Sequence, residues 1–316
     1  RRLVETALAW PQSLDASMTT YAERPLDYSE QTIAASRKIA GHYLIGMTAT
    51  LDLQRSTDAS QLVNVPSADR SLIFHARWQT RDDAFTMRAG RREGLDAFYT
   101  IGLGVEFGRN GPLQFGMRAG RDQVADELPT LRIGGMKDNL IADGSWQANE
   151  RVTVSGSVEM DRFYSQARTY LGSGVLSTAQ VSYRIRTAYP DYTIRVVGTH
   201  GDYGAGGRAD ALISSLLPAA SRSASAGNFM PATYTQYGLF AGFGTDLRER
   251  YTHRWRPFLE VGVVHDSIQG GGAAIDAGMA GSVFGGDHAA LFSQHQRVSR
   301  LGTPVTVVGA QYRWLY

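Results

Sequence analysis

Apolar and polar residues alternate one by one along most of the chain, from about residue 41 to the carboxy-terminus. Successive side chains of an extended strand point to opposite faces, so a period of two predicts β-strands with one apolar and one polar face. The alternation recurs in 98–108, 113–122 and 151–160. In 43–53, the residues Tyr43, Ile45, Met47, Ala49, Leu51 and Leu53 alternate with Gly46, Thr48, Thr50 and Asp52.

The length of these strands and the order of their connections distinguish two all-β architectures. Strands of about ten residues are long for a soluble sandwich but suit a tilted strand that crosses a membrane. Short turns such as 81–83, 110–111 and 189–191 alternate with long connections such as 123–135 and 203–233. Transmembrane barrels have short periplasmic turns and longer external loops, whereas a sandwich gives no reason for such sorting. The pattern predicts fourteen strands, at 42–54, 70–79, 84–92, 97–108, 112–122, 136–147, 151–163, 175–187, 191–202, 234–246, 257–267, 273–284, 287–296 and 303–316.

Aromatic residues support the barrel and its orientation. If the carboxy-terminus is periplasmic, Tyr43, Trp78, Phe85, Phe107, Trp146, Tyr192 and Tyr312 all lie near periplasmic strand ends, as in an interfacial girdle. The last strand alternates and ends in Tyr312, Trp314 and Tyr316. A final strand with an aromatic carboxy-terminus resembles the signal that the barrel assembly machinery reads, although the usual last residue there is Phe. We therefore expect that machinery to be a partner.

Composition alone would have indicated a soluble protein. The 316 residues are 43% hydrophobic, their mean hydropathy is −0.24, and no apolar run is long enough for a membrane helix. In a barrel the same averages arise because every second strand residue faces lipid and the others face water. The absence of cysteine excludes disulfides and thiolate sites, and the net charge of +2 gives no reason to expect nucleic acid.

Residues 1–40 lack a clear barrel pattern and are interpreted as an amino-terminal lead-in, with the barrel in 41–316. No apolar segment typical of a signal peptide follows Arg1 and Arg2. The segment 3–10 (LVETALAW) could form a short helical stub, the end of an upstream helical domain.

The segment 231–266 reads PATYTQYGLFAGFGTDLRERYTHRWRPFLEVGVVHD. It resembles the C-terminal barrel of exopolysaccharide-export porins, above all the PelB-type barrels of Pel export, with the poly-N-acetylglucosamine and cellulose export porins as relatives. The resemblance covers about 41–316 and rests on overall pattern. It implies sixteen strands, so we expect 14–16, with a missing pair in 11–40 or 204–232. It also implies an upstream tetratricopeptide region, a passive channel without cofactors, polymer-synthesising machinery and a periplasmic lipoprotein ring.

The polar face would line the lumen of such a barrel. Charged rings on a pore wall select what passes, so these residues could form a path for a polar polymer. They could equally pair across neighbouring strands and stiffen the wall. Carboxylates would attract the partly deacetylated, cationic polymer that a Pel-type resemblance implies, whereas arginines would suit an anionic one. The candidate lumen residues are Asp52, Glu106, Asp122, Asp143, Glu159, Asp161, Glu260, Asp266, Arg88, Arg118, Arg184 and Arg195.

The longest connection, 203–233, contains an apolar stretch that ends at Pro218 and predicts a short helix. Apolar residues on an external loop need something to pack on. We expect this loop either to fold over the mouth as a gate or to pack on its neighbours at the surface. Its candidate gate residues are Leu212, Leu216, Leu217 and Phe229.

Catalytic and metal sites are not expected. His200 lies near Asp202 toward an external strand end, but the adjacent His265 and Asp266 would point to opposite faces of a strand. His288 and His295 offer only weak metal-ligand spacing. The pattern predicts a non-enzymatic porin of the Gram-negative outer membrane, and the resemblance implies that it exports a biofilm exopolysaccharide. A general or small-solute diffusion porin is the alternative, and a non-conducting structural or receptor barrel is a third class.

Overall fold

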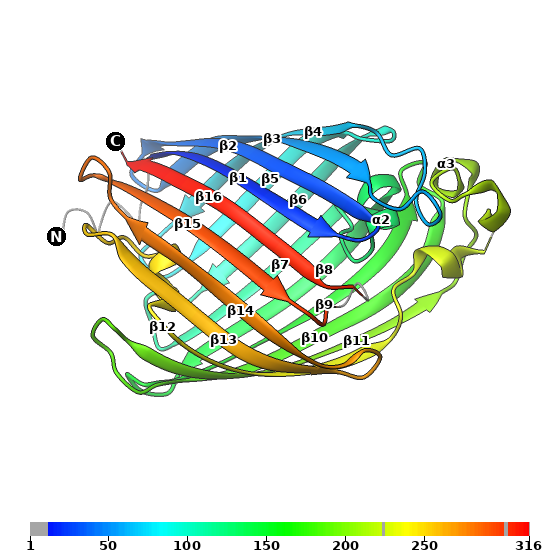
Figure 1. The fold of residues 1–316 in the computed structure, drawn as a ribbon. Coiled ribbons are helices and arrows are strands. Elements are labelled where there is room, and N and C mark those ends of the chain that lie inside the picture. Colours follow the sequence, from blue (N-terminus) through cyan, green and yellow to red (C-terminus); the bar gives the residue numbers. More distant parts are fainter. Residues whose placement is uncertain (1–11, 223–224, 300–302, 316) are drawn as a thin grey trace.

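The computed structural model describes residues 12–222, 225–299 and 303–315, and within them the chain forms one closed antiparallel barrel (Figure 1). Each strand pairs with its sequence neighbours, and the first pairs with the last. No helix among the described residues is long and apolar enough to cross a membrane. The sixteen strands are β1 (Ser13–Glu23), β2 (Leu26–Ala40), β3 (Tyr43–Ser56), β4 (Ala68–Gln79), β5 (Ala84–Glu93), β6 (Ala97–Phe107), β7 (Leu113–Gln123), β8 (Gly135–Gln147), β9 (Val152–Ser165), β10 (Tyr170–Arg184), β11 (Tyr192–Ala205), β12 (Tyr234–Phe243), β13 (Arg256–Asp266), β14 (Gly270–Gly281), β15 (Asp287–Gln296) and β16 (Val305–Leu315).

All fourteen strands predicted from the alternation are present as β3 to β16, and the additional pair lies in 11–40. The expected domain boundary at residue 41 is therefore wrong. β1 closes the barrel against β16, with Ser13 opposite Leu315 and Glu23 opposite Val305. The segment 3–10, where a helical stub was expected, lies outside the described residues, as does Tyr316.

The alternation sorts side chains between the two faces of the wall. On β6 the apolar side chains of Tyr99, Ile101 and Leu103 are exposed on the outer surface, while Gly102 and Glu106 face inward. The same sorting places Trp78, Phe107, Trp146 and Trp314 on the outer surface at the end where the termini lie. An apolar outer face with aromatic residues at its edge is what a lipid bilayer requires.

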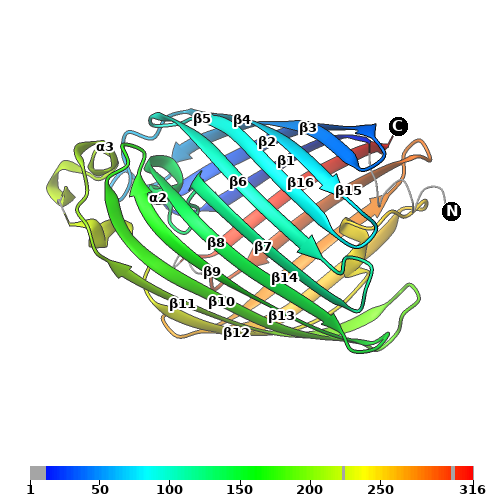
Figure 2. The same ribbon diagram turned by 180° about the vertical axis from the view of Figure 1, so that it is seen from behind.

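Long connections gather at the end of the barrel opposite the termini (Figures 1 and 2). There lie α2 (Pro129–Gly134), α3 (Ala211–Ser214), and the 3₁₀ turns η1 (Ala219–Ser221) and η2 (Ala226–Phe229). A third 3₁₀ turn, η3 (Thr245–Arg248), belongs to the connection 244–255 at the end of the termini. With the carboxy-terminus periplasmic, the end with α2 and α3 is the external one.

Candidate functional site: the barrel lumen and its plug

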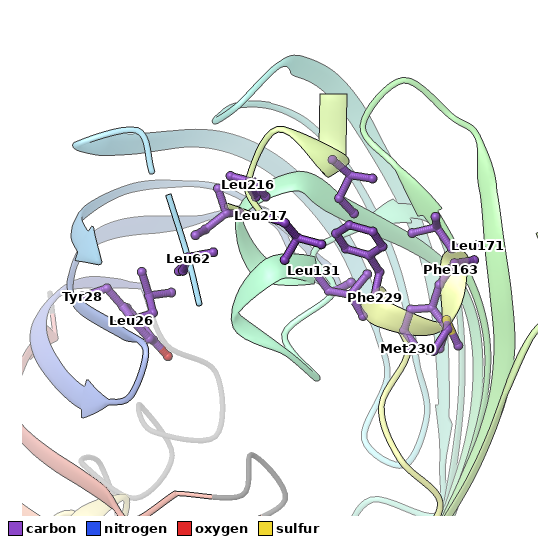
Figure 3. Close-up of a cluster of buried hydrophobic side chains, with 14 residues drawn as sticks. Leu26, Tyr28, Leu62, Leu131, Phe163, Leu171, Leu216, Leu217, Phe229 and Met230 are labelled. Atoms are coloured by element: carbon purple, nitrogen blue, oxygen red, sulfur yellow. The ribbon is translucent and has the colours of Figure 1, made fainter. Parts of the chain in front are cut away.

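The external mouth holds an apolar cluster built from segments far apart in sequence (Figure 3). β2 contributes Leu26 and Tyr28, whereas Phe163 of β9 and Leu171 of β10 come from the opposite wall. Since β2 and β10 are eight strands apart in a barrel of sixteen, a cluster that touches both crosses the mouth. We call this cluster the plug; its members are Leu26, Tyr28, Leu62, Ala125, Leu131, Ile133, Phe163, Leu171, Ile213, Leu216, Leu217, Ala226, Phe229 and Met230.

Three of the four gate candidates belong to the plug. Leu216, Leu217 and Phe229 are buried there, but Leu212 is only half-buried, and its neighbour Ile213 takes the core position. The helical stretch expected before Pro218 is present as the single turn α3. Its N-terminal residue Asp210 accepts hydrogen bonds from the backbone N–H of Ile213 and from the Ser165 hydroxyl. Although partial burial opposes the charged form, these bonds lower the pKa of Asp210 below its ordinary value.

Two hydrogen bonds fasten the loop 203–233 to another external loop. The N–H of Val63 donates to the carbonyl of Leu216 at 2.8 Å, and the Asn64 side chain donates to the carbonyl of Ser215 at 2.8 Å. These bonds join 57–67 to the segment after α3. The plug is therefore a single packed unit of several loops and not one loop lying loose on the surface.

Sequence reasoning missed the helix α2, which reaches the lumen wall from the connection 123–135. Its Arg132 binds Asp52 of β3 at 3.0 Å and lies over the Tyr28 ring at 3.8 Å. Burial opposes the charge on Arg132, yet the pKa of this guanidinium is raised because Tyr28, Asp52 and Glu30 surround it. The one available signal was Pro129, which is favoured in the first turn of a helix.

Two further buried ionic clusters hold the external half of the wall. Arg92 of β5 binds Asp69 of β4 at 2.6 Å, with both side chains at most 4% exposed. The same guanidinium donates to the carbonyl of Arg132 at 2.8 Å, which ties α2 to the wall.

The second cluster surrounds Lys137 of β8. Its ammonium lies 2.8 Å from the predicted Glu159 and 3.4 Å from the predicted Asp161. It also contacts Glu127, which precedes α2, at 2.5 Å. These predicted lumen carboxylates thus serve to anchor the segment that carries the plug.

The periplasmic half of the wall is lined by paired charges around a cavity of about 220 Å³. Arg77 donates two hydrogen bonds to Glu106, at 3.0 and 2.7 Å. Arg118 binds Asp143 at 2.8 Å. The predicted Arg88 lines the same cavity and forms no ion pair with a described residue.

Other predicted lumen residues also pair across strands. Arg195 of β11 binds Glu260 of β13 at 2.5 Å and lies over the inward Phe240 ring at 4.3 Å. Arg184 of β10 binds Asp246 of η3 at 2.9 Å. Both interactions connect strands or loops that are distant in sequence, so they stiffen the wall.

Inward aromatic residues at the periplasmic end pack beneath the connection 244–255. Phe258 and Phe292 are buried together with Leu247 of η3. The Arg248 guanidinium lies 3.5 Å from the centre of the Phe292 ring, and the carbonyl of Arg248 contacts His288 at 3.0 Å. This connection therefore folds inward and narrows the lumen at that end.

Asp122 and Asp266 depart from the predicted lumen wall in different ways. Asp122 lies at a bulge between Gly120 and Gln123, where its φ of 54° turns the carboxylate toward Arg168. The prediction for Asp122 is wrong because strict alternation does not survive a bulge. Asp266 does face inward, but it is 1% exposed and accepts the backbone N–H groups of Ile268 and Gln269 in the following turn.

Glycines on the inner face make room for neighbouring side chains. A Cβ on Gly102 would lie 2.3 Å from the Arg88 guanidinium, and one on Gly262 or Gly309 would collide with Phe240 or Phe292. Inward glycines thus accept long side chains that lie flat along the wall.

The histidines singled out in the sequence lie apart from one another and on different faces of the wall. His200 contacts the Thr235 hydroxyl at 2.8 Å, and His265 is exposed on the outer face while Asp266 is buried inside. No group of three or more His, Asp or Glu side chains that could hold a metal ion is present among the described residues.

Comparisons with known proteins agree with this geometry. The family model described as the PelB C-terminal beta barrel domain matches residues 8–315. A solved bacterial polysaccharide outer membrane secretin is similar in fold, with a TM-score of 0.70, 12% identity, and coverage of 96% of this chain and 98% of that one. CdiB from Acinetobacter baumannii is more distant, with a TM-score of 0.51, 8% identity, and coverage of 96% and 60%. No curated protein matches the sequence at a significant level. The chain belongs to the family of PelB C-terminal β-barrel domains, the outer-membrane barrels of exopolysaccharide export.

Proposed function

We propose that this barrel is the passive outer-membrane exit for a Pel-like biofilm polysaccharide that is partly deacetylated and cationic. The observation that carries the proposal is a closed barrel of the PelB family with a polar lumen. A packed plug crosses the external mouth of this barrel. Sixteen strands spaced about 4.8 Å apart and tilted by about 40° enclose a cylinder about 30 Å across between backbones. Such a cylinder can take an extended sugar chain once the plug moves aside.

The lumen wall suits a charged polymer that must keep moving. Glu106 and Asp143 keep roughly two-fifths of their side-chain surface exposed although each is held by an arginine. A partly exposed carboxylate can exchange its arginine for a passing ammonium group with little net change in free energy. We assign the polymer path to the inward residues Glu106, Asp143, Glu260, Arg88, Arg118, Arg184 and Arg195. Asp52, Glu159 and Asp161 would join this path only when the plug moves, because in the closed barrel they hold Arg132 and Lys137.

The plug serves as the gate in this proposal. Leu216, Leu217 and Phe229 close the mouth by apolar packing, and polymer pressure or a partner opens it. Deleting 206–228 should raise the single-channel conductance of the barrel in a planar bilayer. Unchanged conductance would remove the gate assignment.

The proposal extends to partners, which the family resemblance supports. We include a periplasmic lipoprotein ring, the polymer-synthesising machinery, an upstream tetratricopeptide region and the barrel assembly machinery, which would read Tyr312 and Trp314 on β16 together with the terminal Tyr316. Reading the gene upstream of Arg1 tests the tetratricopeptide region directly.

Secretion itself can be tested in a cell that makes the polymer. Removing the gene that contains this chain should abolish polymer in the medium while polymer accumulates in the periplasm. Restoring the gene should return export. Normal export together with impaired uptake of small solutes would instead support the diffusion porin.

A further inference from the structure

Arginines gather on the outer surface of the barrel at its external end. Arg70 of β4, Arg91 of β5, Arg121 of β7 and Arg162 of β9 are all exposed there, and Arg168 follows in the turn between β9 and β10. Their cross-strand neighbours establish the face. Arg91 is opposite Leu72 and Tyr99, and Arg121 is opposite Ile101, all of them exposed apolar side chains of the outer surface. We call these five residues the arginine strip.

The arginine strip lies at the external edge of the apolar band on the outer surface of the barrel. Arg70 is two residues from the exposed Leu72 on the same strand face, and Arg162 is two residues from the exposed Met160. Tyr99 is 71% exposed, and the Arg91 guanidinium lies 5.9 Å from its ring. Tyrosine and arginine at the border of an apolar band mark the level of lipid headgroups.

Positive charge is in excess along the strip. Arg91 binds Glu93 at 2.9 Å, and Arg168 binds Asp138 at 3.1 Å and also contacts Asp122. With Glu93, Asp122, Asp138 and Asp202 as the neighbouring carboxylates, the five arginines leave a surplus of about one positive charge by formal counting at neutral pH. Arg70 lies opposite Glu93 and Arg162 lies opposite Asp138 on the neighbouring strands, but neither arginine forms an ion pair within the described part of the chain.

The outward arginines that lie on strands at the external end are confined to one sector of the barrel. At the corresponding outer positions of β11, β13 and β15 the chain has His200, His265 and His295. In that sector the exposed arginines of the external end lie in connections, Arg208 and Arg222 after β11 and Arg297 after β15, and the described strand residues there include no outward arginine at this end. A belt present merely for membrane anchoring would have no reason to be one-sided, so the strip fits a specific ligand.

We propose that the arginine strip binds the phosphate-bearing headgroup of a lipid in the outer leaflet of the outer membrane. Guanidinium groups bind phosphate in a bidentate manner, and basic surfaces at the headgroup level recognise phosphorylated lipids. The acyl chains of the same lipid would lie on the apolar face below, along Leu72, Ile101 and Met160. A lipid held there would seat the external end of β4 to β10, the wall that carries α2 and the plug.

Binding can be measured by native mass spectrometry of the purified barrel in detergent, with added lipid A or with lipid A whose phosphates have been removed. The wild-type barrel should retain the phosphorylated lipid at least about tenfold more tightly than the dephosphorylated one, since each basic group near a charged headgroup contributes about 1 kcal/mol. The double variant Arg121→Gln/Arg162→Gln should lose this preference.

The control is His265→Gln/Arg297→Gln, which changes two exposed residues at the same end in the other sector. It should keep the wild-type preference. Both variants should retain the heat-dependent shift on electrophoresis that reports a folded barrel. Equal retention of the two lipids by the wild type, or an unchanged preference in the Arg121→Gln/Arg162→Gln barrel, would overturn the proposal.

Discussion

The plug makes a direct prediction about channel opening, which Phe229→Ala tests most sharply. The Phe229 side chain is fully buried at the mouth, beside Leu131 of α2 (Figure 3). It belongs to the 3₁₀ turn η2 and to no strand, so the substitution leaves the sequence of the barrel strands unchanged. Its effect should fall on the closed state of the plug.

The expected size of the effect follows from burial. Replacing a fully buried phenylalanine by alanine costs about 3–5 kcal/mol, because apolar contact is lost and a cavity remains. If the loops of the plug move together, that free energy is removed from the closed state alone. Each 1.4 kcal/mol is a factor of ten in an equilibrium, so the open-to-closed ratio should rise about a hundredfold or more.

Single-channel recording in planar bilayers measures that ratio directly. The variant should show frequent long openings with the same open conductance as rare openings of the wild type. Phe284→Ala is the matched control, because Phe284 is 84% exposed in a turn at the other end of the barrel. Equal open probability in Phe229→Ala and wild type would show that the cluster does not close the channel.

Three other substitutions test the wall and the loop. Asp69→Ala should lower the free energy of unfolding of the barrel by about 3–5 kcal/mol, measured by urea unfolding from lipid, because it leaves the Arg92 charge buried and unpaired. As the control, Arg55→Ala removes an exposed ion pair and should cost at most about 1 kcal/mol. Arg88→Glu should shift the reversal potential in a salt gradient toward cation selectivity, and an unchanged potential would mean that Arg88 does not face the ion path. The pKa of Asp210 is lowered in the folded protein, so its stabilising effect on the plug is present above the pKa of the unfolded chain and is lost as the pH falls through the folded value. Acidification below about pH 4 should therefore increase opening of the wild type but not of Asp210→Asn, and identical pH profiles would contradict this role.

The sequence was sufficient for most of the fold because lipid imposes a period of two on every strand with an apolar outer face. It was insufficient for β1 and β2. The outer face of β1 alternates Leu14 and Met18 with Ala16, Thr20 and Ala22, and β2 begins its outer face with Asp27, Ser29 and Gln31. Small and polar residues weaken the alternation in these two strands. The sequence pattern therefore did not show β1 and β2, and they were expected only because the family resemblance implied sixteen strands.

The candidate site was predictable only in part, for a different reason. Alternation gives the face of a residue, and it placed Glu106, Arg118 and Glu260 inward. It does not give the partner, since partners depend on the register between strands and on where loops return. Arg132 reaches Asp52 from 80 residues away, and no local pattern in 123–135 announces it. For Asp122 even the predicted face is wrong. The sequence around it alternates regularly, but a bulge turns its side chain to the other face.

The pairing of wall charges bears on how a passive exporter can work at all. A pore must attract its cargo enough to admit it and hold it weakly enough to release it. Unpaired carboxylates along the lumen would bind a cationic polymer at many points at once and hold it in place. In this barrel Arg77, Arg118 and Arg195 each bind a carboxylate. A passing ammonium group that replaces one of them would gain only the difference in free energy between two similar ion pairs. Under the proposed function, movement would then need no energy input beyond the synthesis that pushes the chain, and the plug rather than the wall would resist leakage.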